Sequence, residues 1–171
     1  MLNQTEERGI PGMVELIESN LLFETARNLT FQEGDSVVEF GTFFGRSTNA
    51  ISQGLRQNPT FTKTGNFFAY DTFSCKVNGG FYKHVLDFSK IGNVEHLVKR
   101  YDQTIDFLPV FKHYLKDYID SGIVIPIRAE LTNSEPFTDS IVLMHIDSPK
   151  FYEEFKIIMF VFLTKMRVGS I

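Results

Sequence analysis

Four short apolar runs punctuate the chain, and each is followed closely by a polar or charged residue. They are residues 37–40, 67–70, 123–127 and 141–146. Near-continuous apolar runs of this length are typical of strands that helices cover on both faces of a sheet. Pro126 cannot donate a hydrogen bond to a neighbouring strand, so the third run is expected at an edge of the sheet.

Apolar residues recur at helical spacing in the stretches between these runs. The pattern predicts helices over residues 11–29, 46–55, 93–100, 107–118 and 151–166. In the first helix the residues expected to face the core are Val14, Ile17, Leu21, Leu22 and Leu29. In the last helix they are Phe155, Ile158, Met159, Phe162 and Leu163.

Strand and helix signals alternate along most of the chain, which predicts an α/β protein with a doubly wound, mostly parallel sheet of the Rossmann-like kind. The 171 residues suffice for one domain with a substantial core. That domain is expected to consist of an N-terminal helix at residues 11–29 and a core at residues 36–171. Residues 79–122 carry few strand signals.

Composition narrows the class of protein. The formal net charge is −4, which argues against nucleic acid as the main partner. Cys75 is the only cysteine, so no intrachain disulfide can form, and the polar N-terminus resembles no signal peptide. The longest apolar run, residues 157–163, is far shorter than the ~20 residues that span a bilayer. We therefore expect a cytoplasmic protein without a membrane partner.

The turn after the first predicted strand has the spacing Glu-x-Gly-x-x-x-Gly, formed by Glu39, Gly41 and Gly45. A strand that turns tightly into a helix needs glycine where φ is positive or where a ligand meets bare backbone. The helix then points its free amides at whatever lies over the turn. The spacing matches neither the dinucleotide-binding fingerprint nor the phosphate loop, in which a lysine follows the last glycine.

An acid follows the second predicted strand directly. At this position Asp71 could accept hydrogen bonds from both hydroxyls of a ribose. The alternative is an aspartate that only caps a helix or stabilises a turn.

Taken together, these segments resemble class I S-adenosylmethionine-dependent methyltransferases. The turn resembles motif I of that family, and Tyr70-Asp71-Thr72-Phe73 resembles a segment of its bacterial small-molecule branch, which includes macrolide sugar O-methyltransferases. The resemblance implies S-adenosyl-L-methionine as cofactor. It implies cofactor contacts from Glu39, Gly41, Thr42, Gly45, Ser47, Asp71, Thr72 and Glu130, with Glu39 at the amino group and Glu130 near the adenine.

The segment after the fourth predicted strand extends the resemblance. His145, Ile146 and Asp147, with Tyr152 and Glu153, align with a motif at the mouth of the active site in these relatives. The resemblance implies that the base which accepts the acceptor's proton is Asp147, His145 or Lys150. Asp147 is also the candidate ligand for a divalent metal such as magnesium. Pro149, however, stands where many relatives carry a second acid, which argues against a metal site.

The resemblance also implies a strand order of 3-2-1-4-5, with strands five to seven of the family's domain missing after residue 171. An apolar last helix beside an open sheet edge would then favour a homodimer. The function expected is methyl transfer to an oxygen of a small-molecule acceptor, such as a sugar. Two alternatives stay open: a degenerate cofactor-binding or interaction domain without activity, and a nicotinamide-dependent oxidoreductase, which lacks the third glycine.

Overall fold

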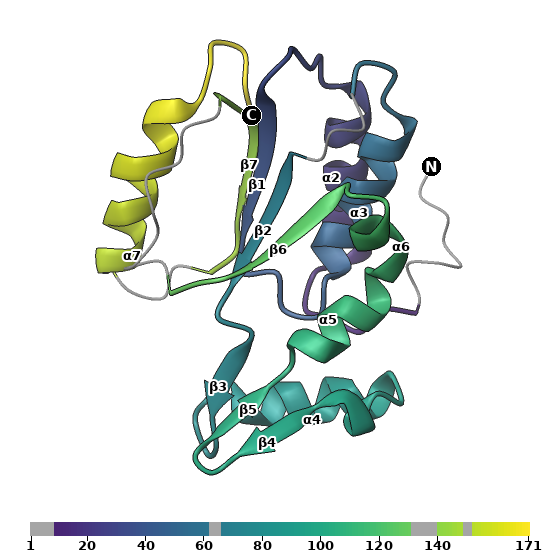
Figure 1. The fold of residues 1–171 in the computed structure, drawn as a ribbon, viewed down its shortest axis with the longest axis vertical. Helices are drawn as coiled ribbons and strands as arrows, with labels where there is room; N and C mark the ends of the chain where they lie inside the picture. The colour runs from purple at the N-terminus through teal and green to yellow at the C-terminus, as the bar shows by residue number, and fades with distance from the viewer. Residues whose placement is uncertain (1–8, 62–65, 131–139, 149–151) are drawn as a thin grey trace.

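The computed structural model describes residues 9–61, 66–130, 140–148 and 152–171, and a parallel four-stranded sheet lies at its centre (Figure 1). The strand order is β6-β2-β1-β7. The strands are β1 (Asp35–Phe40), β2 (Phe67–Asp71), β6 (Val124–Arg128) and β7 (Ser140–Ile146). All four predicted strands are confirmed, as are the order of these four and the edge position of the strand that contains Pro126.

Helices cover both faces of this sheet, as its apolar strands require. In β1, Val37 belongs to the core on the side of α3 (Arg46–Gln57), whereas Val38 and Phe40 belong to the core beneath the C-terminal helix. All three side chains are fully buried. The α/β class with a parallel sheet flanked by helices is therefore confirmed, in an arrangement compatible with a Rossmann-like fold.

The face that the first helix presents to the core is partly the predicted one, because Leu22 and Leu29 pack against the core whereas Ile17 and Leu21 do not. Helix α2 (Leu16–Asn28) buries Ser19, Phe23 and Ala26 against α3, while Ile17 and Leu21 are 75% and 68% exposed. The cause lies in α3, where a side chain on Gly54 would collide with the backbone of α2. The close approach occurs at Phe23 and Ala26 of α2, and Ile17 and Leu21, which do not share this side of the helix, turn outward.

A second, antiparallel sheet lies in the region where few strands were expected. It has the order β3-β5-β4, with strands β3 (Ser74–Lys76), β4 (Lys99–Tyr101) and β5 (Thr104–Asp106). The predicted helix at 93–100 is wrong: a 3₁₀ turn (Glu95–Leu97) runs directly into β4. The hairpin between β4 and β5 turns at Asp102 with φ of 30° and contains no glycine, so the usual hairpin signal is missing.

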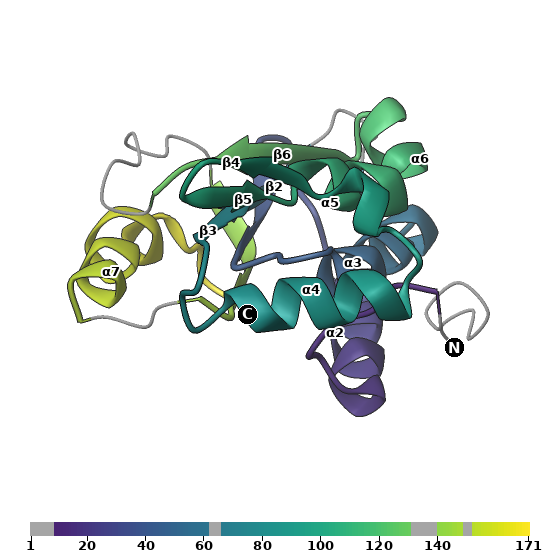
Figure 2. The same ribbon diagram turned by 90° about the horizontal axis from the view of Figure 1, so that it is seen from below.

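Three further helices belong to the same stretch of the chain. Helix α4 (Tyr82–Ile91), which the sequence did not predict, runs alongside the small sheet, and both lie beyond the end of the central sheet where β2 stops (Figure 2). The predicted helix at 107–118 is interrupted at Leu115, giving α5 (Leu108–Tyr114) and α6 (Lys116–Asp120).

The C-terminal segment covers the face of the sheet opposite α2 and α3 (Figure 1). It comprises α7 (Tyr152–Ile157), a π-helical turn (Ile158–Phe162) and a 3₁₀ turn (Leu163–Lys165). Ile158 and Phe162 are fully buried as predicted, but Phe155 and Leu163 are exposed. The predicted inward face is therefore only partly right, because the π-helical turn changes the angular spacing of successive side chains.

The outer edge of β7 receives hydrogen bonds from the last residues of the chain. Met166 forms a parallel bridge with Ile141, and the Ile171 amide donates to the Val142 carbonyl at 3.0 Å. This short segment occupies the position expected for the start of a fifth strand. Within the ranges that the structure describes, no helix is long and apolar enough to cross a membrane.

The expectation of a homodimer stays a prediction, and Phe160 gives it a test. This side chain is 73% exposed beside α7. If a second copy covers this face, Phe160→Glu should shift the chain from dimer to monomer in sedimentation velocity at high micromolar concentration, because a buried unpaired charge is costly. The matched control is Ile17→Glu on the opposite face, which should leave the dimer intact. A monomeric wild-type chain, or dissociation by Ile17→Glu alone, would contradict the prediction.

Candidate functional site

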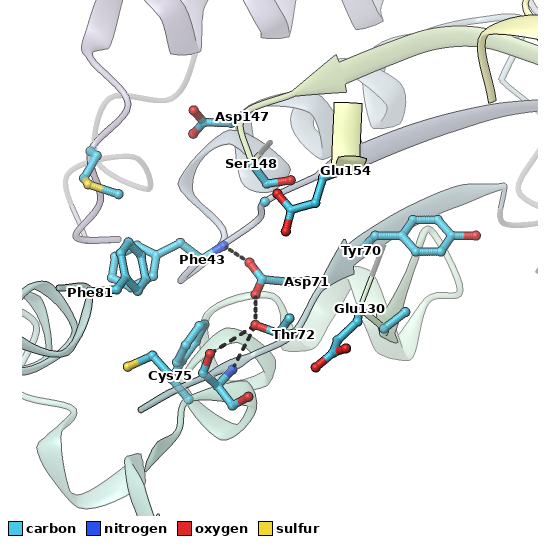
Figure 3. A pocket seen from close by; sticks show the side chains of 15 residues that line it. Phe43, Tyr70, Asp71, Thr72, Cys75, Phe81, Glu130, Asp147, Ser148 and Glu154 are labelled. Atoms are coloured by element: carbon cyan, nitrogen blue, oxygen red, sulfur yellow. Dashed lines mark hydrogen bonds between the residues drawn. The ribbon is translucent and has the colours of Figure 1, made fainter. Parts of the chain in front are cut away.

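A cavity of about 490 Å³ opens at the carboxyl ends of the parallel strands. Its walls come from the turn after β1, the ends of β2 and β7, the segment after β6 and the start of the small sheet (Figure 3). Its volume lies in the usual range for cavities that enclose a small molecule or cofactor. This is also the edge of an open parallel sheet at which ligands generally bind.

The chemical character of the cavity is acidic and aromatic. Four carboxylates line it, from Asp71, Glu130, Asp147 and Glu154, and no described lining residue is Lys, Arg or His. Aromatic rings of Phe43, Phe81 and Phe107 form much of the apolar wall, with ring centroids of Phe43 and its two neighbours 5.2 and 5.6 Å apart. Carboxylates and aromatic faces both attract cations, so the cavity favours a positively charged ligand over an anionic one.

The turn that carries the two predicted glycines is held in the left-handed region of backbone space. Gly41, Phe43 and Gly45 have φ values of 85°, 49° and 95°. Gly41 lines the cavity, and a Cβ there would lie 2.5 Å from the Cβ of Ser148. Gly45 lies instead beneath the side chain of Leu115, so the space left by its missing side chain is filled by the protein itself.

Asp71 holds this turn to the end of β2. Its carboxylate accepts hydrogen bonds from the backbone amides of Phe43 at 2.9 Å and Phe73 at 2.8 Å, and a longer one from the Thr72 hydroxyl at 3.4 Å. Burial raises the pKa of Asp71 above its ordinary value, although these hydrogen bonds oppose the shift. Most of the roughly four acceptor directions of a carboxylate are thus already used. Asp71 faces the cavity, but with less capacity for two ribose hydroxyls than the sequence suggested.

Glu39 lies one layer beneath the cavity. It is fully buried, accepts a 2.5 Å hydrogen bond from the Thr48 hydroxyl, and lies 3.1 Å from Nδ1 of His145, its direct neighbour on β7. Burial by itself lowers the pKa of His145. The hydrogen bond to Glu39 and the negative charges of Glu39 and Asp147 raise the pKa by more than burial lowers it, so the pKa of His145 lies above its ordinary value. Neither Glu39 nor His145 lines the cavity.

The remaining predicted residues are divided between the surface of the cavity and its surroundings. Thr72, Glu130 and Asp147 line it, whereas Thr42 and Ser47 are buried beside a smaller cleft at the start of α3. Lys150 lies outside the described residues.

Sequence reasoning missed several residues that form the walls. Met13, Phe81 and Phe107 supply apolar surface, and Ser148 and Glu154 supply polar groups. The phenylalanines precede α4 and α5 in the stretch whose small sheet was not predicted, so no sequence signal pointed to them. Glu154 stands directly after the aligned Glu153, which was the nearest available signal.

A metal site at Asp147 finds no support in the surrounding side chains. Over residues 9–61, 66–130, 140–148 and 152–171, no three His, Cys, Asp or Glu side chains gather as metal ligands would. A divalent magnesium ion prefers several oxygen ligands in octahedral geometry. The described side chains around Asp147 thus supply too few ligands for magnesium, and no step below is derived through a metal.

Comparison with known proteins does not place the chain: it matches no family model and no curated protein. The functional argument therefore rests on the geometry and charge of the cavity.

The pair of His145 and Glu39 predicts a specific dependence of stability on pH. Because the pKa of His145 is raised in the folded state, the pair stabilises the fold fully below the ordinary histidine pKa of about 6.5. This stabilisation should be lost as the pH rises through the raised value. Denaturant unfolding measured from pH 5 to 9 should therefore show a decline in wild type that His145→Gln flattens. The control, His113→Gln at an exposed histidine of α5, should keep the decline, and an equal decline in all three would contradict this origin.

Asp71 should matter for stability as well as binding. Asp71→Ala leaves the buried amides of Phe43 and Phe73 without an acceptor, so the free energy of unfolding should fall by ~1–3 kcal/mol. Asp71→Asn, which keeps one carbonyl oxygen, should cost less. The matched control is Glu130→Ala, an exposed acid of the same cavity, for which a change within ~0.5 kcal/mol is expected. Equal stability of Asp71→Ala and wild type would show that the carboxylate does not hold the turn.

Proposed function

We propose that this chain is an S-adenosylmethionine-dependent methyltransferase that acts on an oxygen of a small molecule, such as a sugar or another secondary metabolite. The observation that carries the proposal is the acidic, aromatic cavity at the carboxyl ends of a parallel sheet. S-adenosylmethionine carries a sulfonium cation, which carboxylates and aromatic faces stabilise. The strand order β6-β2-β1-β7 agrees with the first four strands of the class I methyltransferase fold, which supports the same reading.

The residues of the cavity fit the parts of this cofactor. Gly41 and Phe43 present the turn to the ligand, and Asp71 offers its remaining acceptor capacity to a ribose hydroxyl. Glu130, at the end of the segment after β6, can accept a hydrogen bond from the adenine amino group. The cofactor, when bound, supplies an electrophilic methyl group to an acceptor hydroxyl, which gives up its proton.

Two of the three proposed bases can be compared in position. Asp147 is exposed to the cavity and can accept the acceptor's proton. His145 is held against Glu39, and its raised pKa favours the charged form that cannot accept a proton. We therefore assign the base role to Asp147 and a positioning role to His145, which anchors the strand end that carries Asp147.

The acidity of the cavity also weighs against a nicotinamide-dependent oxidoreductase. A dinucleotide carries a pyrophosphate, and this anion would face Asp71, Glu130, Asp147 and Glu154 without a described lysine or arginine in the lining. Like charges in a desolvated site repel strongly.

A second candidate is an interaction domain that has lost cofactor binding. The observation that favours it is the engagement of two predicted cofactor acids by the chain itself. Glu39 is bound by Thr48 and His145, and Asp71 is bound by backbone amides. Both arrangements also suit a binding site that is preorganised before its ligand arrives.

Calorimetric titration with S-adenosylmethionine and with NAD tests these candidates together. We expect S-adenosylmethionine to bind about tenfold or more tightly than NAD, and to lose affinity as salt screens the carboxylates. The double variant Glu130→Gln/Glu154→Gln removes two charges from the cavity and should weaken binding several-fold. The charge-matched control is Glu33→Gln/Asp117→Asn, at exposed acids outside the cavity. Preferred binding of NAD, or no binding of either ligand, would overturn the proposal, and the latter would favour the interaction domain.

A further inference from the structure

One face of the small antiparallel sheet carries lysines and an aromatic ring. The register of the three strands places Lys76, Thr104 and Tyr101 side by side in one row. Lys99 lies opposite Asp106 in a second row, two residues away along each strand and therefore on the same face. Both lysines are exposed, and Tyr101 is 54% exposed. We call this surface the basic face.

The row between these two points to the other side of the sheet. Its central residue, Ile105, is fully buried. In the same row, the guanidinium of Arg100 donates a hydrogen bond to the Tyr82 hydroxyl of α4 at 2.9 Å. Because side chains alternate between the two faces of a sheet, α4 covers the side of Ile105, and the basic face is turned to solvent (Figure 2).

Arg128, the last residue of β6, joins the basic face to the rim of the cavity. Its guanidinium binds the Asp106 carboxylate at 2.6 Å, and the Leu108 amide donates to the same carboxylate at 2.9 Å. The one acid of these two rows is therefore already engaged. The two residues after Arg128 line the cavity, as does Ser74, which lies in the row of Asp106. The basic face and the cavity thus share a border.

Charge changes sign across this border. Residues 74–116 contain seven Lys and Arg against four Asp and Glu, although the formal net charge of the whole chain is −4. Four carboxylates line the cavity, whereas Lys76, Lys99 and Arg128 lie outside it. An anionic part of a ligand would be repelled from the cavity and attracted to the basic face. By the usual strand dimensions, Lys76 lies ~7 Å and Lys99 ~10 Å from Ser74 at the rim, which is within reach of a small-molecule ligand.

We propose that the methyl acceptor is linked to a nucleoside diphosphate that lies on the basic face while the acceptor hydroxyl enters the cavity. Lys76 and Lys99 bind the phosphate oxygens, since an ammonium group attracts phosphate as a point charge. The exposed ring of Tyr101, beside both lysines, offers the base a surface for stacking. A lone phosphate would leave this ring without a role.

This inference rests on the proposed function and narrows its substrate class to an acceptor with an anionic carrier group. It does not alter the argument against a pyrophosphate inside the cavity, because the basic face lies outside it.

A polynucleotide fits the basic face less well than one nucleoside diphosphate. Tyr101 is the only aromatic residue in the three strands, whereas single-stranded nucleic acid is generally bound by several stacking rings along a positively charged groove. The acidic cavity at the border would also repel further phosphates.

Calorimetric titrations of the intact chain saturated with S-adenosylhomocysteine test the inference. The probes are uridine diphosphate, inorganic pyrophosphate and uridine. Uridine diphosphate should bind about tenfold or more tightly than uridine, and its affinity should fall as the salt concentration rises. Lys76→Gln/Lys99→Gln should remove most of this advantage. Tyr101→Ala should lower the affinity for uridine diphosphate to about that for pyrophosphate.

The charge-matched control is Lys83→Gln/Lys90→Gln, at exposed lysines of α4, which should leave all affinities unchanged. All variants should bind S-adenosylhomocysteine as wild type does, because the basic face lies outside the cavity. Equal affinity of wild type for uridine diphosphate and uridine, or an equal loss in the control, would overturn the inference while the proposed function stands. Competition between uridine diphosphate and S-adenosylhomocysteine, or tighter binding of a single-stranded thymidylate octamer, would do the same. S-adenosylhomocysteine is titrated first, and its failure to bind would instead overturn the proposed function.

Discussion

The turn between β1 and α3 can exist only if positive φ is tolerated at Gly41, Phe43 and Gly45, and the rest of the site depends on this constraint. Phe43 pays a steric penalty that glycine would not. The hydrogen bond from its amide to Asp71 compensates for that penalty and fixes the turn to β2. Leu115 then packs against the bare backbone of Gly45, so the break between α5 and α6 is positioned by the same turn. The conformation of the turn thus fixes its position against β2 and the packing of Leu115, between α5 and α6, against it.

Charge is concentrated around this turn against the ordinary preference of a protein interior. Glu39 is buried with a histidine whose pKa is raised, and Asp71 keeps its carboxylate in a site where burial raises its pKa. Both groups are tolerated because each accepts several hydrogen bonds, which offset the cost of removing a carboxylate from water. A cationic ligand would lower that cost further. The same hydrogen bonds hold the turn to β2 and join Glu39 of β1 to His145 of β7, so both buried acids contribute to the fold of the site.

The central sheet was predictable from sequence because its strands are buried on both faces and leave continuous apolar runs. Helix α3 was predictable because the glycine turn marks its start. The small sheet was not, since three-residue strands such as Ser74–Lys76 are too short to show alternation. The outward face of Ile17 was also hidden, because it results from the close approach of α2 to Gly54, a contact between residues distant in sequence. Periodicity reports which residues share a face and not which face meets the core.

The acidity of the cavity could not be foreseen either, because it too results from residues that are distant in sequence. The net charge of −4 is modest, and Asp71, Glu130, Asp147 and Glu154 come from four segments with no charge cluster in the sequence. They meet because Asp71 ends β2 while Glu130 and Asp147 come shortly after β6 and β7 of the same parallel sheet, and Glu154 lies in the first turn of α7. Parallel topology brings strand ends together at one edge of the sheet, so single acids at those ends jointly give the cavity a negative electrostatic potential. Two rings of the aromatic wall, Phe81 and Phe107, come instead from the starts of α4 and α5 beside the small sheet, which the central topology does not specify. The acidic part of the site therefore follows from the order of the strands, and the other part depends on local structure that only the folded chain reveals.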